Sequence, residues 1–238
     1  MRPAIQKQTL QVRQTAAPIR ALDELDSYQV PGRHREEFLR MRQTLSTALS
    51  EGAARTLLFA SSSSCEGTTT IASQFAIVLA DSGDNVLLVD ANLRHPALHS
   101  RFQLVKECGF SDLAVLACSA REAAKPTKLK GLSIITSGGS DSNPYCLFDS
   151  KRLKPVVDEL RTMAGWVLFE TSAVNDFNDA LSLAGLVDGV ILVIQAEKTR
   201  WEVVQCARDR LAGINAPITG TVLNRRKTYI PDWIYSRL

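Results

Sequence analysis

Short apolar runs that alternate with stretches of helical periodicity are the feature that most constrains the fold of this chain. The runs are strand-sized and far shorter than the roughly 20 residues of a membrane-spanning helix. They are Thr56–Ala60, Val86–Val89, Leu132–Ile135, Trp166–Phe169, Val190–Ile194 and Ile218–Leu223. The helical stretches between them are Thr69–Ala80, Ser150–Met163, Ala180–Leu186 and Arg200–Leu211. Near-continuous apolar strands separated by helices predict a doubly wound α/β domain, with a mostly parallel sheet covered on both faces.

The 238 residues suit one such domain with its own core. We expect a mobile N-terminal arm over residues 1–30, which are polar and interrupted by Pro3 and Pro18. A single α/β domain is then expected over residues 31–238, ending in an aromatic tail. An amphipathic helix is predicted over Glu36–Leu49, because apolar residues recur there at helical spacing.

Composition narrows the environment and the partners. The chain has 28 basic and 25 acidic side chains, and its formal charge of +3 gives no sign of a nucleic-acid partner. Its five cysteines are odd in number and form no C-x-x-C motif, so we expect neither a disulfide framework nor a zinc site. The first twenty residues lack the apolar run of a secretory signal. These features favour a reducing, cytoplasmic location.

A loop of small residues follows the first apolar run and reads SSSSCEGTTT over residues 61–70. In such a loop, backbone N–H groups converge on an anion and the dipole of the following helix favours negative charge. Gly67 lets the backbone approach a phosphate closely, and the Thr69 hydroxyl is suited to ligate Mg²⁺. Taken alone, however, the segment is better explained as a turn that caps a helix.

Carboxylates follow two other apolar runs. Asp90 comes directly after Val86–Val89, and Glu170 directly after Trp166–Phe169. In open parallel sheets, ligands bind in the crevice outside the carboxyl ends of the strands. Two carboxylates beside a phosphate-type loop can hold a metal and orient a water or hydroxyl. We therefore predict catalytic roles for Asp90 and Glu170, and a Mg²⁺ site made by Thr69, Asp90 and Glu170.

Together these segments resemble the bacterial tyrosine kinases of capsule and exopolysaccharide synthesis, which are relatives of the Min/Par ATPases. That family reads S-S-x-P-G-E-G-K-S-T, V-L-L-I-D-A-D-L-R-R-P and D-T-P-P-V where this chain has SSSSCEGTTT, VLLVDANLRHP and ETSAV. Similar stretches at Asn143–Ser150, Leu183–Lys198 and Val222–Arg225 extend the match to roughly residues 36 to 228. The resemblance implies a P-loop NTPase architecture and binding of ATP or ADP with Mg²⁺. The residues that it assigns to the nucleotide are Cys65, Glu66, Gly67, Thr68, Thr69, Thr70, Arg94, Asn224 and Arg225.

Several positions depart from the family pattern. Thr68 stands at the place of the phosphate-loop lysine, and no lysine occurs between residues 7 and 106. Cys65 replaces a glycine, Asn92 the second aspartate and Glu170 the metal-side aspartate, and Ser64 replaces a proline. Loss of one well-placed cation or donor typically costs about 3 kcal/mol, or roughly a hundredfold in rate. Together the changes predict weakened ATP binding and catalysis that is abandoned or strongly reduced. Compensation by Arg94 or by a neighbouring subunit's arginine is the alternative.

Both ends also differ from the family. Its kinases end in a tyrosine cluster, whereas this tail holds only Tyr229 and Tyr235 among apolar residues, which favours a hydrophobic anchor. Phosphorylation of Tyr235 is the alternative. The family's E-x-x-R-x-x-R helix, used in ring assembly, has Glu36, Leu39 and Arg42 at those places, so homo-oligomerisation through it is in doubt.

The resemblance implies a cytoplasmic component of an exopolysaccharide or capsule biosynthesis and export system. The departures make it a degenerate kinase that regulates a membrane polysaccharide co-polymerase of the chain-length-determinant type, held at the inner membrane by that partner. An active ATP-dependent protein-tyrosine autokinase with unusual motifs is the first alternative. A Min/Par-like ATPase is the second, disfavoured because the Asn143–Ser150 segment resembles the polysaccharide family.

Overall fold

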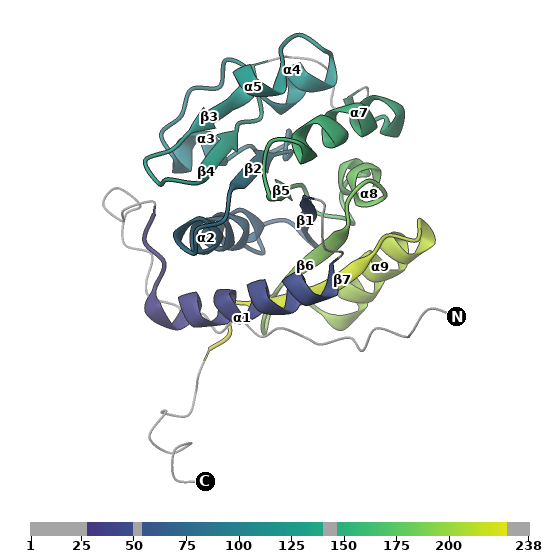
Figure 1. The fold of residues 1–238 in the computed structure, drawn as a ribbon. Coiled ribbons are helices and arrows are strands. Elements are labelled where there is room, and N and C mark those ends of the chain that lie inside the picture. The colour runs from purple at the N-terminus through teal and green to yellow at the C-terminus, as the bar shows by residue number, and fades with distance from the viewer. Residues whose placement is uncertain (1–27, 50–53, 140–146, 228–238) are drawn as a thin grey trace.

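A computed structural model describes residues 28–49, 54–139 and 147–227 of the chain. Its centre is a seven-stranded sheet with the strand order β3-β4-β2-β5-β1-β6-β7. All neighbouring strands are parallel except the β3–β4 pair (Figure 1). The strands are β1 (Arg55–Ser61), β2 (Val86–Asp90), β3 (Ala124–Pro126), β4 (Leu132–Ile135), β5 (Trp166–Glu170), β6 (Gly189–Gln195) and β7 (Ile218–Asn224). The predicted doubly wound, mostly parallel α/β fold is confirmed.

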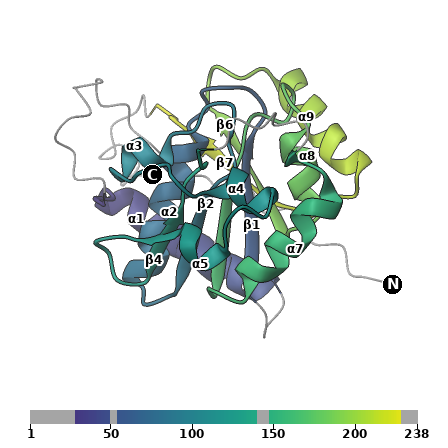
Figure 2. The same cartoon turned by 90° about the horizontal axis from the view of Figure 1, so that it is seen from above.

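Helices cover both faces of the sheet (Figures 1 and 2). They are α1 (Gly32–Ala48), α2 (Thr68–Asp81), α3 (Leu98–Arg101), α4 (Phe110–Ala114), α5 (Ala120–Ala123), α7 (Ser150–Arg161), α8 (Asp179–Ala184) and α9 (Trp201–Gly213). Residues of α1, α2 and α3 belong to the core on one face, and residues of α4, α5, α7, α8 and α9 to the core on the other. Among the described helices, none combines the length and apolar character needed to cross a bilayer.

Aromatic rings join the helices to the sheet on each face. On the α2 side, the Phe75 ring centroid lies 6.0 Å from Phe38 of α1, 5.9 Å from Phe59 of β1 and 6.1 Å from Trp166 of β5. Buried rings of α1, β1 and β5 therefore all pack against Phe75 of α2. Aromatic pairs at this spacing add to the stabilisation from apolar burial. The phosphate-type loop is thus connected to a rigid strand at one end and to a firmly packed helix at the other.

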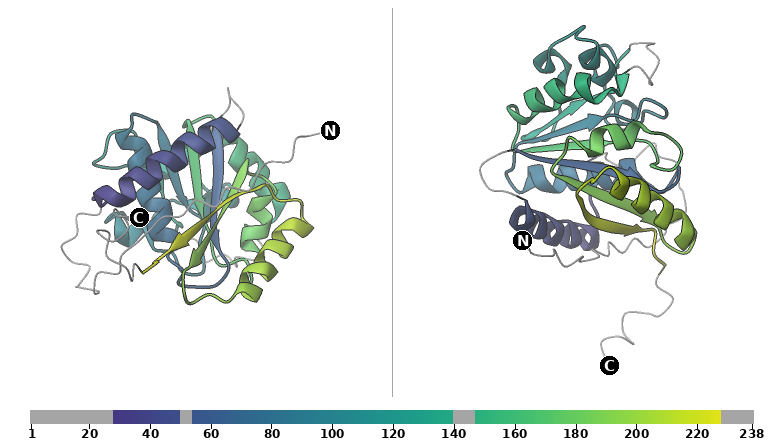
Figure 3. Two further views of the ribbon diagram at one scale, coloured as in Figure 1. Left: turned by 90° about the horizontal axis from the view of Figure 1, so that it is seen from below. Right: turned by 90° about the vertical axis from the view of Figure 1, so that its right-hand side faces the viewer.

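The predicted amphipathic helix is confirmed as α1, which runs along the side of the sheet that α2 also covers (Figure 3). Its buried residues follow helical spacing and include Phe38, Met41 and Leu45. Arg42 forms two hydrogen bonds with the carboxylate of Asp84, at 2.7 and 3.3 Å. Arg42, which stands at one position of the family's assembly motif, therefore bonds to a residue of its own chain.

The sequence did not predict β3 or the short helices α3, α4 and α5. The β3 strand has only three residues, Ala-Lys-Pro, and no apolar run to mark it. Pro126 is tolerated there because β3 lies at the edge of the sheet, where a missing N–H removes no ladder bond. The predicted N-terminal arm lies almost wholly outside the described residues. Tyr28, within its predicted bounds, packs its ring against Phe102 at 5.5 Å.

One expectation about the cysteines is wrong. The structure joins Cys108 to Cys118 in a disulfide, where the sequence predicted none. The two cysteines lie on either side of α4, and the fold of this segment brings their Cα atoms within 6.7 Å. Spacing alone does not show this, because it depends on the turn that α4 makes. Cys65 and Cys206 are free and exposed, and Cys146 lies outside the described residues.

Candidate functional site

The predicted site residues gather at the carboxyl ends of β1, β2, β5 and β7. Residues 62–67 leave the end of β1 and enter α2, Asp90 ends β2, Glu170 ends β5 and Asn224 ends β7. Because β2, β5 and β1 are neighbours in the sheet, their ends lie side by side. This edge is where open α/β sheets bind their ligands.

The loop of residues 62–67, called the phosphate loop from here on, is packed tightly against β7. Gly67 has φ +91°, a left-handed conformation that favours glycine. A Cβ at Gly67 would lie 2.2 Å from Nδ2 of Asn224, so only glycine fits without displacing that side chain. The same Nδ2 donates a hydrogen bond to the carbonyl oxygen of Glu66 at 2.8 Å. The resemblance assigned Glu66 and Asn224 to the nucleotide, and the structure brings these two residues together.

The N-cap residue of α2 is Gly67, which has no side chain that could cap the helix. The first N–H groups of an α-helix have no acceptor within the helix. These groups and the helix dipole favour an anion at Thr68, Thr69 and Thr70. The backbone donors that a phosphate site would need are therefore at hand, whereas the side chain at Thr68 is a buried hydroxyl instead of an ammonium group.

The backbone at Cys65, which replaces a glycine of the family pattern, has a conformation that favours glycine. Its φ is +66°, in the left-handed region, and its thiol is free and exposed. A residue with a Cβ in this conformation costs on the order of 1 kcal/mol relative to glycine. The chain therefore retains the loop shape typical of a glycine while carrying a larger side chain.

Glu66 holds the phosphate loop from within. One of its carboxylate oxygens accepts hydrogen bonds from the N–H and hydroxyl of Ser62, each at 2.8 Å, and from the N–H of Ser63 at 2.9 Å. The other oxygen accepts from the Thr199 hydroxyl and from the N–H of Gln195 at 3.4 Å. This buried carboxylate thus fixes the loop to the turn between β6 and α9, a role that the sequence did not reveal.

Asp90 and Glu170 face each other across the β2–β5 pair. Their Cα atoms are register partners, and both side chains are buried. One oxygen of Asp90 accepts from the N–H groups of Ala97 and Leu98, at 3.1 and 3.0 Å. Asp90 therefore also shapes the segment that follows β2.

Glu170 is bonded on one oxygen only. That oxygen, Oε1, accepts hydrogen bonds from the Thr69 hydroxyl at 3.1 Å and from the Asn92 amide at 3.2 Å. The other, Oε2, is buried and has no hydrogen-bond partner among the described residues. An aspartate in place of Asn92 would set a third carboxylate here, whereas the amide donates. Two of the departures from the family pattern therefore contact each other: the Asn92 amide donates a hydrogen bond to the Glu170 carboxylate.

Burial shifts the acidity of this pair. The pKa of Asp90 rises to about 6, because burial penalises the charged form more than the hydrogen bonds from Leu98, Ala97 and Asn92 favour it. The pKa of Glu170 lies well above its ordinary value, first because of burial and second because of the Asp90 charge. Without a cation, this pair of carboxyl groups therefore retains a proton near neutral pH.

The predicted Mg²⁺ ligands fit that ion in kind. Thr69, Asp90 and Glu170 offer one hydroxyl and two carboxylates, and among the described residues Oε2 of Glu170 is buried without a hydrogen-bond partner. Oxygen donors of this kind suit Mg²⁺, which keeps several waters and takes few protein ligands. In the described part of the chain, no group of three or more His, Cys, Asp and Glu side chains forms a metal cluster.

Arg94 and Arg225 occupy different places relative to the phosphate loop. Arg94 pairs with the buried carboxylate of Asp179, at 3.0 and 3.4 Å, and its guanidinium lies 4.5 Å above the Phe177 ring. Arg225 instead donates to the Cys65 carbonyl oxygen in the loop, at 3.2 Å. The structure therefore brings Arg225 to the loop and engages Arg94 with α8.

Sequence reasoning also missed two supporting contacts. The Ser64 hydroxyl donates to Asp176 at 2.7 Å, and the Thr199 hydroxyl donates to Glu66. Both partners are more than 100 residues away in the chain and belong to no motif that marks them. Only the folded sheet, which places the segments after β5 and β6 next to β1, brings these groups together.

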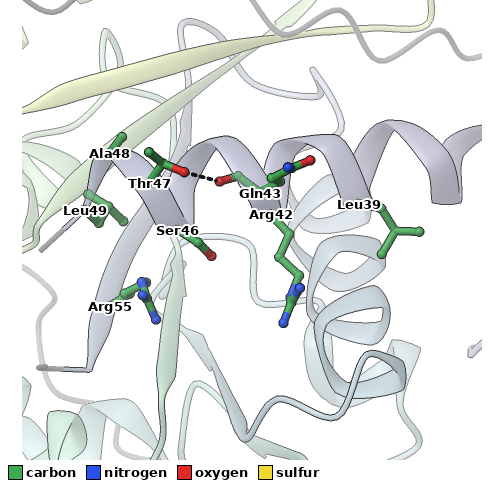
Figure 4. Close-up of a pocket in the computed structure, with 8 residues that line it drawn as sticks. All are labelled: Leu39, Arg42, Gln43, Ser46, Thr47, Ala48, Leu49 and Arg55. Atoms are coloured by element: carbon green, nitrogen blue, oxygen red, sulfur yellow. Dashed lines mark hydrogen bonds between the residues drawn. The ribbon is translucent and has the colours of Figure 1, made fainter. Parts of the chain in front are cut away.

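A cavity of about 810 Å³ lies elsewhere, along α1 and the start of β1. Figure 4 shows two of its lining residues, Arg42 and Arg55, extending to the same side of α1. Arg55 is the first residue of β1, at the opposite end of that strand from the phosphate loop. This cavity is therefore separate from the candidate nucleotide site.

No protein-family model matches the chain. Tyrosine-protein kinase YwqD of Bacillus subtilis (strain 168) is 30% identical over 192 residues, which make up 81% of each protein. Succinoglycan biosynthesis transport protein ExoP of Rhizobium meliloti (strain 1021) is 25% identical over 193 residues, which are 80% of this chain and 25% of ExoP.

Solved structures with a similar fold include a chimerical protein and a cell division ATPase. The chimerical protein CapA2B2 superimposes with a TM-score of 0.76 at 26% identity, over 83% of this chain and 87% of that one. The cell division ATPase MinD of Pyrococcus furiosus gives a TM-score of 0.63 at 20% identity, over 74% and 76% of the two chains, which shows a shared fold alone. From the identity to YwqD over four fifths of both proteins, the chain belongs to the bacterial tyrosine-protein kinase family.

Proposed function

We propose that this protein is a nucleotide-binding member of the tyrosine-kinase family in which phosphoryl transfer is lost or strongly reduced. The observation that carries the proposal is Thr68 at the place of the loop lysine, at the start of a helix whose backbone donors remain. Phosphoryl transfer depends mainly on positioning and on stabilisation of negative charge. A site that keeps its backbone cradle but lacks that cation would bind a nucleotide better than it would catalyse.

In this proposal, different residues would contact the phosphates, the metal ion and the adenine. The N–H groups at the start of α2 would receive phosphate oxygens, while Glu66 and Asn224 hold the loop in shape. Thr69, Asp90 and Glu170 would hold Mg²⁺, which supplies positive charge to screen the phosphates. Asn224 and Arg225 stand, by resemblance, at positions that touch the adenine in the wider family. Binding of a divalent cation would also remove the proton that the buried Asp90–Glu170 pair retains near neutral pH.

We propose further that the chain is one folded domain that acts on the cytoplasmic face of the inner membrane. Its partner would be a membrane polysaccharide co-polymerase of the chain-length-determinant type, which it would regulate during polymer assembly. This assignment is supported by the similarity to ExoP, whose name connects it with succinoglycan biosynthesis and transport. The predicted tail, with Tyr229 and Tyr235, lies outside the described residues, so its anchoring role remains a prediction.

An active tyrosine kinase is the second candidate, and the carboxylate half of the site favours it. Asp90 and Glu170 are paired at neighbouring strand ends, and the Thr69 hydroxyl is bonded to Glu170. Incubation of the full chain with ATP, Mg²⁺ and the cytoplasmic tail of the co-polymerase tests the two candidates. We expect nucleotide binding without significant phosphotyrosine. Robust phosphotyrosine that disappears in Asp90→Ala would overturn the proposal and establish an active kinase.

A further inference from the structure

The segment from the phosphate loop into the start of α2 has no lysine, and carboxylates lie within the loop and at nearby strand ends. Glu66 lies within the loop, and the buried Asp90 and Glu170 lie at the neighbouring strand ends. Arg94, the cation that the sequence offered as compensation, is held by Asp179. A nucleotide that carries several negative charges therefore needs positive charge from elsewhere in this edge of the sheet.

Arg225 is a cation that touches the loop itself. Its Nη1 donates to the carbonyl oxygen of Cys65 at 3.2 Å and to Oε1 of Gln195 at 3.1 Å. Both acceptors are uncharged, and no carboxylate in residues 28–49, 54–139 and 147–227 forms an ion pair with this side chain. Both bonds use Nη1, so the donors on Nε and Nη2 are not used by either of them. The charge of Arg225 is thus present at the loop and is not neutralised there by an acid.

The backbone holds Arg225 in this place. Its φ is +57°, in the left-handed region, and its N–H donates to Oδ1 of Asn224 at 2.8 Å. Asn224 in turn donates to the Glu66 carbonyl and fills the space beside Gly67. Two neighbouring residues therefore contact the loop, one against its backbone near Gly67 and the other at Cys65. A strained conformation that is fixed by such contacts is typical of a functional position.

We propose that Arg225 supplies to the nucleotide phosphates the positive charge that is missing at Thr68. This inference rests on the proposed nucleotide binding and assigns Arg225 to the phosphates rather than to the adenine. A guanidinium pairs well with phosphate oxygens, since its planar donors match their geometry. The loop would then bind phosphate through backbone N–H groups from α2 and a side chain from the end of β7.

Calorimetric titration of the full chain with two probes, MgATP and magnesium tripolyphosphate, tests this role. Arg225→Gln is expected to weaken the binding of both probes by about tenfold or more, because each loses a charged donor. Lys227→Gln removes the same charge two residues away, from an exposed side chain, and is expected to change the binding of either probe by less than about twofold. Thermal melts of each variant show whether the fold is retained.

A second variant connects Arg225 to the missing lysine. In Thr68→Lys combined with Arg225→Gln, an ammonium group in the loop is expected to restore most of the lost affinity for both probes. If Arg225→Gln binds both probes as the wild type does, Arg225 is not the source of charge. If it loses affinity for MgATP but not for tripolyphosphate, Arg225 contacts the base or sugar and the inference is wrong. If the wild type binds neither probe, the proposed function itself fails.

Discussion

The two halves of the candidate site differ in which features of the family pattern they retain. At the ends of β2 and β5, Asp90 and Glu170 remain paired, and the Thr69 hydroxyl completes a set of oxygen donors. At the end of β1, the loop keeps its backbone shape but has Thr68 at the place of its cation. The residues proposed to hold a metal and the residues proposed to bind phosphates therefore lie at different strand ends. The experiments below change one half at a time.

The largest effect is expected from the carboxylate half, in Glu170→Gln. Asp90 and Glu170 have folded-state pKa values above their unfolded values, so the folded protein binds more protons. For Asp90, the stability associated with the extra proton is full below the unfolded value near pH 4 and is lost as pH rises through about 6. For Glu170, it is lost as pH rises through a folded-state pKa that lies well above the ordinary glutamate value. Glu170→Gln removes the group whose charged form burial and the Asp90 charge disfavour, so it should stabilise the metal-free protein at pH 7.5 and much less at pH 5.

Thermal and urea unfolding between pH 5 and pH 8, with EDTA present, measures this difference. Glu202→Gln, which neutralises an exposed carboxylate on α9, is the matched control and should change stability little at either pH. An equal gain in stability at both pH values would contradict the assigned cause, since a proton-linked penalty must depend on pH.

The sequence predicted the position of the two carboxylates better than the contacts of Glu66 and Arg94. Asp90 and Glu170 follow apolar runs directly, and the carboxyl ends of neighbouring parallel strands must meet at one edge, so their proximity was predictable. The contacts of Glu66 with Thr199 and of Arg94 with Asp179 were not, because each joins segments distant in sequence without a motif. Local pattern predicts which residues reach an edge, but not which side chains pair there.

The same limit applies to the fold. The strands with apolar runs were predicted, since a parallel strand buried on both faces needs such a run. The edge strand β3 has none, and the Cys108–Cys118 pair depends on the path of the chain around α4. Features fixed by long-range packing or by a short turn therefore became visible only in the structure.

The next effect concerns the internal support of the phosphate loop, in Glu66→Gln. An amide oxygen can still accept from Ser62 and Ser63, but the NH₂ group cannot accept from Thr199 and Gln195. Hydrogen bonds to charged groups contribute about 1.5–3 kcal/mol each. The Thr199 hydroxyl can rotate and accept from the new NH₂ group, so the net loss is that of about one such bond, roughly 2 kcal/mol in the free energy of unfolding. Urea denaturation at pH 7.5 measures it, again with Glu202→Gln as the control. An unchanged midpoint would show that Glu66 does not hold the loop.

A smaller effect is expected when the loop regains the family's residues, in Thr68→Lys with Cys65→Gly. An ammonium group beside the phosphates should raise the affinity for MgATP by about tenfold. The gain should be larger in the background of Arg225→Gln, where the guanidinium that donates to the Cys65 carbonyl oxygen is removed. Calorimetry with MgATP measures both. An affinity that stays the same in both backgrounds would show that neither side chain supplies the charge.

The smallest effect isolates the backbone of the loop from its charge, in Cys65→Gly alone. The left-handed φ of Cys65 is strained for a residue with a Cβ, so glycine should relieve up to about 1 kcal/mol, partly offset by the greater freedom of the unfolded chain. Differential scanning calorimetry measures this stability, and Cys206→Gly in the middle of α9 is the contrasting variant, which should destabilise by about 1 kcal/mol. A loss of stability in both variants would mean that the Cys65 side chain makes contacts that outweigh its strain. A gain in Cys65→Gly without a change in MgATP affinity would show that the shape of the loop is already suited to phosphate, and that its deficit is one of charge.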